Sequence, residues 1–457
     1  MAKNQKWIDP NLPVWFDGKN INEALFCEEF LRTHKILFAE GAFFTSDGRV
    51  TDELPLRREI YEELRCCAVN NIPRKIGNIV EILKLAAQVE DFPPQADRIH
   101  PSNGTLMLDG SFTEGRPEIV RNRLPVPYRP DAPEPVRWLK FLGGLLCPED
   151  IPTLQEYLGY CLIPSNKGQR MMVIKGNGGE GKSQIGAVLE TMFGCNMKDG
   201  SIGKISENRF ARADLEHILL CVDDDMRMEA LRQTNYVKSI VTAQGKMDLE
   251  RKGKQSYQGW MSARLLAFSN GDLQALFDHS EGFYRRQLIL TTKEKSAGRI
   301  DDPDLAEKLK TEIEGIFLWM FAGLQTLVAN NFKFSESERT IRNREAVKRD
   351  NNNIFDFMES NGYIRLKADS SISSKDLYAI YRMWCEENNL TPLKSRSFSD
   401  AMVASRTKYN LEHCNTVTNS AGRRVWGFMG IEAVARPNIN GFCGDSPCTY
   451  VPEEWLE

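Results

Sequence analysis

A glycine-rich stretch that ends in Lys182 and Ser183 has the residue types that hold phosphate groups. It follows an apolar run of strand character, residues 171–174, and it precedes residues 184–189, which have helical spacing. Glycines let backbone N–H groups approach phosphate oxygens, a lysine can reach the β- and γ-phosphates, and a serine hydroxyl can hold Mg²⁺. The helix that follows would turn its positive end toward the anion. We therefore predict a site for ATP and Mg²⁺ at Gly176, Asn177, Gly178, Gly179, Glu180, Gly181, Lys182 and Ser183.

Carboxylates end a second apolar run. Residues 218–222 have the character of a buried strand, and three aspartates, Asp223, Asp224 and Asp225, follow. Beside a phosphate-binding loop, the first carboxylate would bind Mg²⁺ and the second would polarise the attacking water. We assign Asp223 to the metal, together with Ser183, and Asp224 to the base position. A shift of one residue in the register would bring in Asp225.

Polar residues flank two further strand patterns. Residues 265–268 form a buried run that ends in Ser269 and Asn270, and the neutral amide of Asn270 could bond to the γ-phosphate or to the attacking water. Arg285 and Arg286 come just before an apolar run at residues 287–290. An arginine at the edge of such a module could stabilise charge on the ATP of a neighbouring subunit. Such a shared site would require an oligomer.

A basic segment lies between these motifs. Arg251, Lys252, Gly253 and Lys254 have the pattern of a hairpin tip, which could contact the phosphates of a DNA strand without reading its bases. Short basic runs are also common on solvated surfaces. The position of the segment among ATPase motifs is what favours contact with DNA.

The ordered set of motifs resembles the superfamily 3 helicases, and more narrowly the phage and plasmid primase-helicase family related to the poxvirus NTPase. The segments that carry the resemblance are Gly176–Ser183, Ile218–Asp224, Gly245–Lys254, Ser269–Asn270 and Arg285–Arg286, with Asn103–Leu106 and Gln155–Tyr160 before them and Glu314–Trp319 and Gly323–Leu324 after them.

This resemblance implies ring-shaped hexamers that use ATP to move on single-stranded DNA. It also implies that Lys252 and Lys254 are the hairpin lysines, that Asn270 is the sensor, and that Arg285 or Arg286 is the finger. Two features depart from the family. Asp224 stands where many members have Glu, and the hairpin matches only loosely.

Composition narrows the functional class further. The net charge of −4 gives no overall basic signature, so DNA contacts have to come from local patches. No stretch approaches the roughly 18 apolar residues that cross a bilayer, and the first residues lack the apolar region of a signal peptide. The cysteines show no framework spacing and are interpreted as reduced thiols. We expect a protein of a bacterial cytoplasm without a membrane partner.

The patterns predict an α/β protein: a P-loop (AAA+-like) ATPase core with an N-terminal α/β domain and a C-terminal winged-helix domain. The expected parts are a small α/β or helical domain at 1–95, a connector at 96–164, the ATPase core at 165–330, a polar linker at 331–353, the winged helix at 354–432 and a tail at 433–457. The first part should contain helices near 24–31, 56–67 and 76–89 and a hairpin at Asp47-Gly48. The connector should contain short strands and helices at 136–146 and 151–162. Residues 1–95 are too few for a primase domain, so we expect a helicase without primase.

The expected winged helix contains three helices and a hairpin. The helices are 354–360, a segment capped by Ser373 that ends near Asn388, and 397–405; the strands are 409–417 and 423–431. Helix residues Lys394, Arg396 and Arg406 and wing residues Arg423 and Arg424 would contact duplex DNA. Winged helices also serve as protein-binding modules.

Two functions fit these patterns. The first is a hexameric DNA helicase of phage or mobile-element replication, which would couple ATP hydrolysis to movement of the hairpins along single-stranded DNA. The alternative is an initiator or loader that binds origin duplex DNA and uses ATP as an assembly switch without processive unwinding. Either could recruit a separate primase or loader.

Overall fold

The computed structural model describes residues 12–434, with gaps at 68–69, 227–233, 254, 271–280, 296–301, 351–352, 361, 389, 391 and 419–421. The chain divides into two compact units. The larger unit holds residues 1–273 and 285–344, and the smaller unit holds residues 274–284 and 345–457. No helix among the described residues has the length and apolar character needed to cross a membrane.

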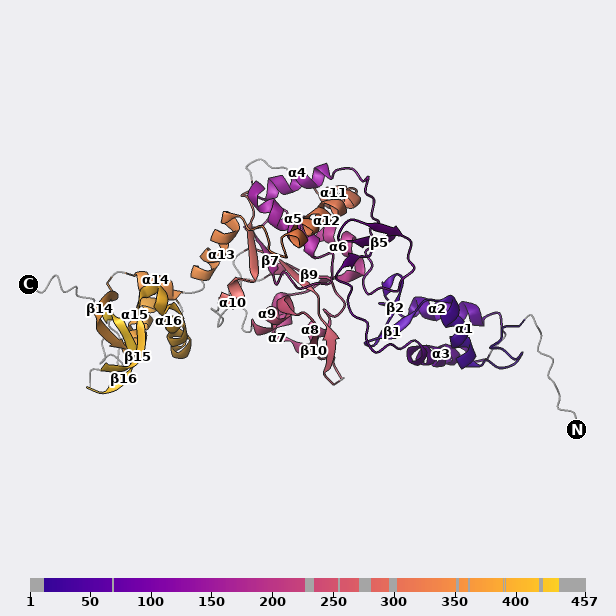
Figure 1. Ribbon diagram of the computed structural model, residues 1–457, viewed down its shortest axis with the longest axis horizontal. Helices are drawn as coiled ribbons and strands as arrows, with labels where there is room; N and C mark the ends of the chain where they lie inside the picture. Colours follow the sequence, from indigo (N-terminus) through magenta and orange to yellow (C-terminus); the bar gives the residue numbers. More distant parts are fainter. Residues whose placement is uncertain are drawn as a thin grey trace, which may run out of the picture. The chain divides into compact units, whose positions relative to one another are not determined.

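The larger unit is built on a five-stranded parallel sheet (Figure 1). Its strands, in spatial order, are β13 (Gln287–Thr291), β7 (Met171–Lys175), β12 (Arg264–Ser269), β9 (Leu220–Met226) and β8 (Met197–Asp199). A parallel sheet covered on both faces consists of strands with continuous apolar runs, and every residue of β12 is buried. The four apolar runs predicted as strands are thereby confirmed, and the chain has the mixed α/β architecture expected.

Helices cover both faces of this sheet. Helices α4, α5, α6, α11 and α12 lie above it in Figure 1, and α7, α8 and α9 lie below it. Their bounds are α4 (Val136–Leu145), α5 (Ile151–Tyr160), α6 (Ser183–Phe193), α7 (Ile202–Glu207), α8 (Arg209–Ala213), α9 (Asn235–Thr242), α11 (Leu305–Lys310) and α12 (Ile313–Ala329). The predicted helices at 136–146 and 151–162 are confirmed, each with a slightly earlier end.

Two glycines set the distance between α5 and α12. A Cβ on Gly159 would lie 2.2 Å from the carbonyl oxygen of Met320, and a Cβ on Gly323 would lie 2.4 Å from that of Gln155. The amide of Gln155 also donates to the carbonyl oxygen of Trp319 at 2.8 Å. Both glycines fall in segments that carry the family resemblance, and close helix packing accounts for their presence.

Replacement of Gly159 should therefore destabilise the larger unit. We expect Gly159→Ala to lower the free energy of unfolding by about 1–3 kcal/mol, because the backbone of α12 must move. In Gly144→Ala, the new Cβ in α4 meets no atom within 4 Å, and we expect a gain of about 0.5–1 kcal/mol from the lower entropy of the unfolded chain. Urea denaturation followed by circular dichroism measures both. Equal effects of the two substitutions would contradict this packing argument.

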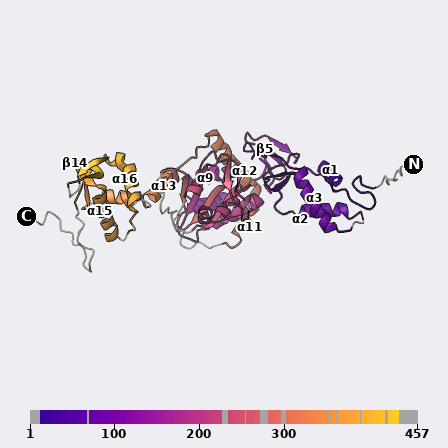
Figure 2. The ribbon, with the colours of Figure 1, turned by 90° about the horizontal axis from the view of Figure 1, so that it is seen from below.

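The N-terminal part has a small helical core beside a short sheet (Figure 1 and Figure 2). Its elements are α1 (Glu23–Thr33), α2 (Leu54–Leu64), α3 (Ile72–Ala86), β1 (Leu37–Ala39), β2 (Ala42–Thr45) and β3 (Gly48–Arg49). The turn between β2 and β3 joins Thr45 to Gly48, which confirms the hairpin predicted at Asp47-Gly48. The connector contributes a second sheet of β4 (Arg98–Ile99), β5 (Gly104–Met107) and β6 (Phe112–Glu114).

A buried polar cluster joins this N-terminal part to the turn before β9. Arg121 donates to Glu40 Oε1 at 2.7 Å and to His217 Nδ1 at 2.9 Å. Burial lowers the pKa of His217 to about 2, and the nearby cations Arg121, Arg49 and Arg251 act in the same direction. His217 is therefore neutral in the folded protein at neutral and mildly acidic pH.

Acid should weaken the folded state through His217. Because its pKa is lower in the folded chain than the unfolded value of about 6.5, the unfolded chain binds the extra proton and stability falls as the pH drops below about 6.5. At about pH 5 the loss from this residue is about 2 kcal/mol. Urea denaturation at pH 7 and pH 5 tests the prediction. In the variant His217→Asn, the new residue tolerates the φ of 67° at this position. The free energy of unfolding that this variant loses between pH 7 and pH 5 should be smaller than in the unchanged protein by about 2 kcal/mol. An equal loss in both proteins would refute the assignment.

The smaller unit packs three helices against a three-stranded antiparallel sheet. The elements are α14 (Asn353–Glu359), α15 (Ser374–Glu387), α16 (Ser395–Tyr409), β14 (Ile364–Ser373), β15 (Glu412–Thr418) and β16 (Arg424–Ala433), with β16 in the middle of the sheet; the unit also contains the short α10 (Glu281–Tyr284). The three helices and the last two strands confirm predicted elements. Strand β14 was not predicted, because most of its residues are exposed and its pairing shifts register between Leu366 and Ser371, which leaves little alternation in the sequence.

Helix α13 (Glu338–Asp350) occupies much of the segment predicted as a polar linker. The residues around its start are bound to the larger unit: Ser337 donates to Asp150 at 2.7 Å, and Glu336 pairs with Arg170 at 2.6 Å. The division between the two units falls after Arg344. The first half of the predicted linker is therefore part of the larger unit.

Candidate functional site

The carboxyl ends of three neighbouring strands meet at one edge of the parallel sheet. Strand β12 pairs with β7 on one side and with β9 on the other. The glycine-rich loop follows β7, Asn270 follows β12, and the aspartates end β9. A cavity of about 450 Å³ opens there, within the range of roughly 300–1,000 Å³ that is common for ligand pockets.

The loop has a backbone that only glycine adopts readily. Gly178, Gly179 and Gly181 have φ values of 100°, 79° and 101°, in the left-handed region. A Cβ on Gly176 would lie 2.6 Å from Lys182 Nζ. These four glycines therefore allow the loop to fold back over the lysine at the start of α6.

The carboxylate of Glu180 lies inside this loop and binds its donors. It accepts hydrogen bonds from the backbone N–H groups of Asn177 and Gly178 and from Lys182 Nζ, the last at 2.8 Å. Burial opposes ionisation, but the contacts with Lys182 and with the backbone prevail and lower the pKa of Glu180. Lys182 Nζ also donates to Asn270 Oδ1 at 3.2 Å. The donor set of the loop thus already holds one anion.

Two of the three aspartates line the cavity. Asp224 and Asp225 are exposed there, at the point where the pairing of β9 with β12 shifts register. Asp223 is buried, its Oδ2 accepts from the backbone N–H of Ile202 at 2.7 Å, and burial raises its pKa. The residues that line the cavity do not include Asp223. The metal role predicted for Asp223 stays a prediction, as does the one-residue register shift considered above.

Other residues at the cavity include both predicted and unexpected ones. Ser183 and Asn270 line it as predicted. Asp302, from the segment before α11, also lines it, and its carboxylate pairs with Lys308 at 2.7 Å. No strand or glycine signal in the sequence marked Asp302, because it reaches the cavity only through the tertiary position of α11.

Arg285 and Arg286 lie immediately before β13, the strand at one edge of the sheet. Arg285 is exposed and Arg286 is half-buried. Neither is among the residues that line the cavity of its own chain. A role at a neighbouring subunit's ATP, and the choice between the two arginines, stays a prediction.

The basic segment forms a hairpin, as predicted. Strands β10 (Lys246–Leu249) and β11 (Tyr257–Trp260) pair antiparallel, and the hairpin projects away from the five-stranded sheet (Figure 1). Lys252 is exposed at the tip. Arg251 instead pairs with Glu216 at 2.6 Å. Lys254 lies outside the described residues.

The five cations predicted to contact duplex DNA are all exposed in the smaller unit. Lys394 and Arg396 lie at the start of α16 and Arg406 in its last turn, while Arg423 and Arg424 lie at the start of β16. Exposure satisfies one condition for contact with DNA. The contact itself stays a prediction.

Two segments match known protein families. Residues 174–286, from the glycine-rich loop to Arg286, match a family described as "Family of unknown function (DUF5906)". Residues 349–416 match the family described as "Poxvirus D5 protein-like". No curated protein sequence matches the chain. The match to the Poxvirus D5 protein-like family lies within the smaller unit.

The chain also resembles solved structures. The apo structure of the NrS-1 C terminal region (305-718) is 12% identical, with a TM-score of 0.52 over 90% of this chain and 100% of that one. A second structure, the A form apo structure of the same region, is 12% identical, with a TM-score of 0.48 over 89% of this chain and 99% of that one. At this identity the first likeness shows a shared fold.

The carboxylate of Glu180 should compete with ligand phosphates for the donors of the loop. We expect Glu180→Gln to tighten the binding of magnesium-ATP about tenfold, because the phosphates no longer displace a charged acceptor from Lys182. Titration with a fluorescent ATP analogue measures the affinity. Glu190→Gln is the matched control, because Glu190 is exposed in α6, the helix that follows the loop. Weaker binding by Glu180→Gln alone would show that Glu180 builds the site instead of competing for it.

Proposed function

We propose that this chain is an ATP-dependent DNA helicase of phage or mobile-element replication, which moves on single-stranded DNA as a ring oligomer. One observation carries the proposal: the glycine-rich loop with Lys182, the carboxylates of Asp224 and Asp225, and Asn270 all line one cavity of about 450 Å³. This combination of a phosphate cradle, acidic residues and a polar amide is what hydrolysis of a triphosphate requires. The similarity to the Poxvirus D5 protein-like family supports the same reading.

The residues of the loop fit a phosphate ligand. Two backbone N–H groups and Lys182 Nζ already bind a carboxylate, so they are oriented toward an anion. We propose that ligand phosphates take the place of the Glu180 carboxylate. Bound ATP with Mg²⁺ would supply the γ-phosphoryl group and a cation that withdraws charge from it.

The remaining residues of the cavity would then have separate tasks. The hydroxyl of Ser183 and a carboxylate from Asp224 or Asp225 are the oxygen ligands that Mg²⁺ prefers. The other carboxylate would orient the attacking water. Asn270, which contacts Lys182 at 3.2 Å, would sense whether the γ-phosphate is present. This assignment takes both carboxylates from Asp224 and Asp225, in place of the predicted pair Asp223 and Asp224.

Movement on DNA would arise between subunits. We propose that Arg285 or Arg286 stabilises the phosphoryl group bound by the neighbouring subunit. Lys252, exposed at the hairpin tip, would contact the phosphates of the threaded strand, together with Lys254. Each hydrolysis step would then change the contacts at one subunit seam and shift one hairpin.

Strand displacement on a forked duplex tests this function. We expect Lys182→Ala to lower ATP turnover at least about 100-fold, because the phosphates lose their charged donor. The variant Lys252→Ala/Lys254→Ala should keep its DNA-free ATP turnover and lose unwinding. Lys140→Ala, which changes an exposed lysine of α4, is the control and should behave as the unchanged protein. A monomer that hydrolyses ATP at full rate without any response to DNA would refute the proposal.

The exposed cations of the smaller unit favour one second candidate, an ATP-switched initiator or loader. Arg396 and Arg406 lie at opposite ends of α16 and are both exposed, as in a helix that enters a DNA groove. In this case ATP would drive assembly at an origin without processive unwinding. Footprinting of one duplex sequence, lost in Arg396→Ala/Arg406→Ala, together with the absence of strand displacement, would favour this alternative.

A further inference from the structure

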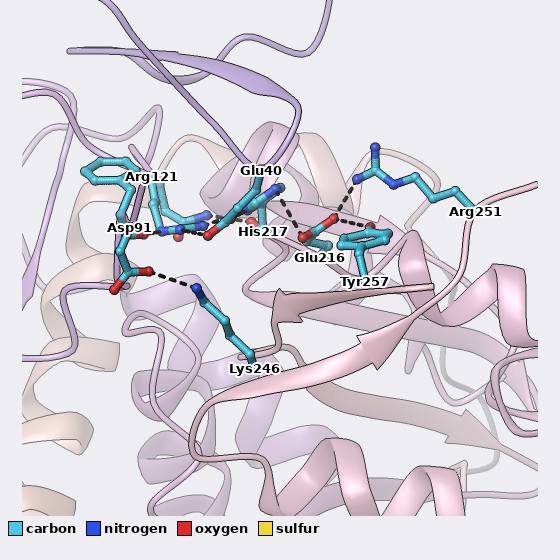
Figure 3. Close-up of polar contacts among 10 residues, drawn as sticks. Glu40, Asp91, Arg121, Glu216, His217, Lys246, Arg251 and Tyr257 are labelled. Atoms are coloured by element: carbon cyan, nitrogen blue, oxygen red, sulfur yellow. Dashed lines mark hydrogen bonds and ion pairs between the residues drawn. The ribbon is translucent and has the colours of Figure 1, made fainter. Parts of the chain in front are cut away.

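Glu216 is a buried carboxylate that the proposed chemistry does not use. It lies in the turn before β9, and its side chain has no exposed surface. Its Oε2 accepts hydrogen bonds from Arg251 Nη2 and from the Tyr257 hydroxyl, both at 2.6 Å (Figure 3). Tyr257 begins β11, and Arg251 lies just past the end of β10. One carboxylate therefore binds both sides of the hairpin tip.

The hairpin strand is shaped to receive this carboxylate. A Cβ on Gly259 would lie 2.4 Å from Glu216 Oε1, closer than side-chain carbons come to oxygen. Glycine is thus required in β11 at the point where Glu216 packs against it. By contrast, a Cβ on Gly245, just before β10, would meet no atom within 4 Å.

The base of the hairpin is fixed from another direction. Lys246 Nζ pairs with Asp91 Oδ1 at 3.0 Å, and Asp91 belongs to the N-terminal part (Figure 3). The residue next to Glu216 is His217, which Arg121 joins to Glu40 in the same part of the chain. The hairpin is therefore held at its tip by the turn before β9 and at its base by the N-terminal part.

A metal ion is the other occupant that this cluster could have. Ligand atoms of Glu40, Glu216 and His217 lie within 4.8 Å of one another, and among the described residues Glu40 Oε2, Glu216 Oε1 and His217 Nε2 have no hydrogen-bond partner. The surrounding charges oppose it. Three guanidinium groups, those of Arg49, Arg121 and Arg251, act on this cluster, against two carboxylates. A divalent cation would add positive charge to a buried site that is already cationic.

We propose that Glu216 is a positioning residue, which latches the hairpin through Arg251 and Tyr257 so that Lys252 is presented to single-stranded DNA. The role of this latch at DNA rests on the proposed function, whereas the contacts of Glu216 with the hairpin do not. Arg251, which was predicted to contact DNA, is paired with this buried carboxylate in the latch, and its contact with DNA stays a prediction. Glu216 lies in the turn that leads into β9, the strand that carries Asp224 and Asp225, so β9 connects the latch to the acidic end of the cavity.

Hydrogen exchange tests the latch without ATP or DNA. We expect the backbone amides of β10 and β11 to exchange roughly tenfold faster in Gly259→Ala, whose Cβ displaces the carboxylate, and in Tyr257→Phe, which loses one charge-assisted hydrogen bond. Gly245→Ala is the matched control and should exchange at the rate of the unchanged protein. Unchanged exchange in both Gly259→Ala and Tyr257→Phe would overturn the latch. So would one equivalent of divalent metal in the purified protein that Glu216→Gln loses.

DNA-stimulated ATP turnover and the salt dependence of DNA affinity distinguish the position of the hairpin from its charge. Tyr257→Phe removes no charge, so the latch predicts a several-fold loss of DNA-stimulated ATP turnover with DNA-free turnover retained. The slope of DNA affinity against salt should fall by about one in Lys252→Ala and stay unchanged in Tyr257→Phe. Full DNA stimulation in Tyr257→Phe would overturn the role at DNA. If the unchanged protein shows no response to DNA, the proposed function fails, and the exchange data still decide whether the latch exists.

Discussion

The insertion of β12 between β7 and β9 is the constraint on which the candidate site depends. These strands are far apart in the sequence, and only parallel pairing on both sides of β12 brings their carboxyl ends to one edge. The loop after β7, the amide after β12 and the carboxylates of β9 could not otherwise share a cavity. Because all residues of β12 are buried, displacing this strand would lose the free energy gained by burying its apolar side chains. The chemistry at the edge is therefore held in place by the hydrophobic core beneath it.

Close backbone contacts support that core. Gly159 and Gly323 bring α5 and α12 together, and the Tyr157 hydroxyl, also on α5, donates to the carbonyl oxygen of Leu265 in β12 at 2.6 Å. Segments that carry the family resemblance outside the site thus position the central strand. A resemblance of this kind reports packing as much as chemistry.

Sequence patterns predicted most of the elements, because apolar periodicity and glycine spacing are local properties. Four of the five strands of the parallel sheet, the hairpin at Arg251 to Gly253 and the three helices of the smaller unit follow from such patterns, whereas the short β8 was not predicted. Strand β14 did not, because a mostly exposed edge strand carries no alternation. Segment 338–350 was predicted as part of a linker because its composition is polar, although it forms α13.

Within the site, the sequence predicted residue types better than their orientation. The acidic run was found, but the register shift that brings Asp224 and Asp225 to the cavity and leaves Asp223 against Ile202 depends on pairing with β12. The ion pair between Arg251 and Glu216 was not predicted, because the two residues are distant in sequence. Glu180 was counted as a loop residue, although its carboxylate fills the donors of the loop. Asp302 had no local signal at all.

The carboxylate of Glu180 has a consequence for how the loop behaves between ligands. With the N–H groups of Asn177 and Gly178 and the ammonium of Lys182 already bonded, the loop does not have to order itself when an anion arrives. In the proposed function, binding would replace the Glu180 carboxylate by ligand phosphates as the acceptor for the same donors. The backbone of the loop would then lose little conformational entropy on binding. Under the proposed function, the Glu180 carboxylate would occupy these donors again when the phosphates leave, so the loop would keep its backbone conformation between ligands.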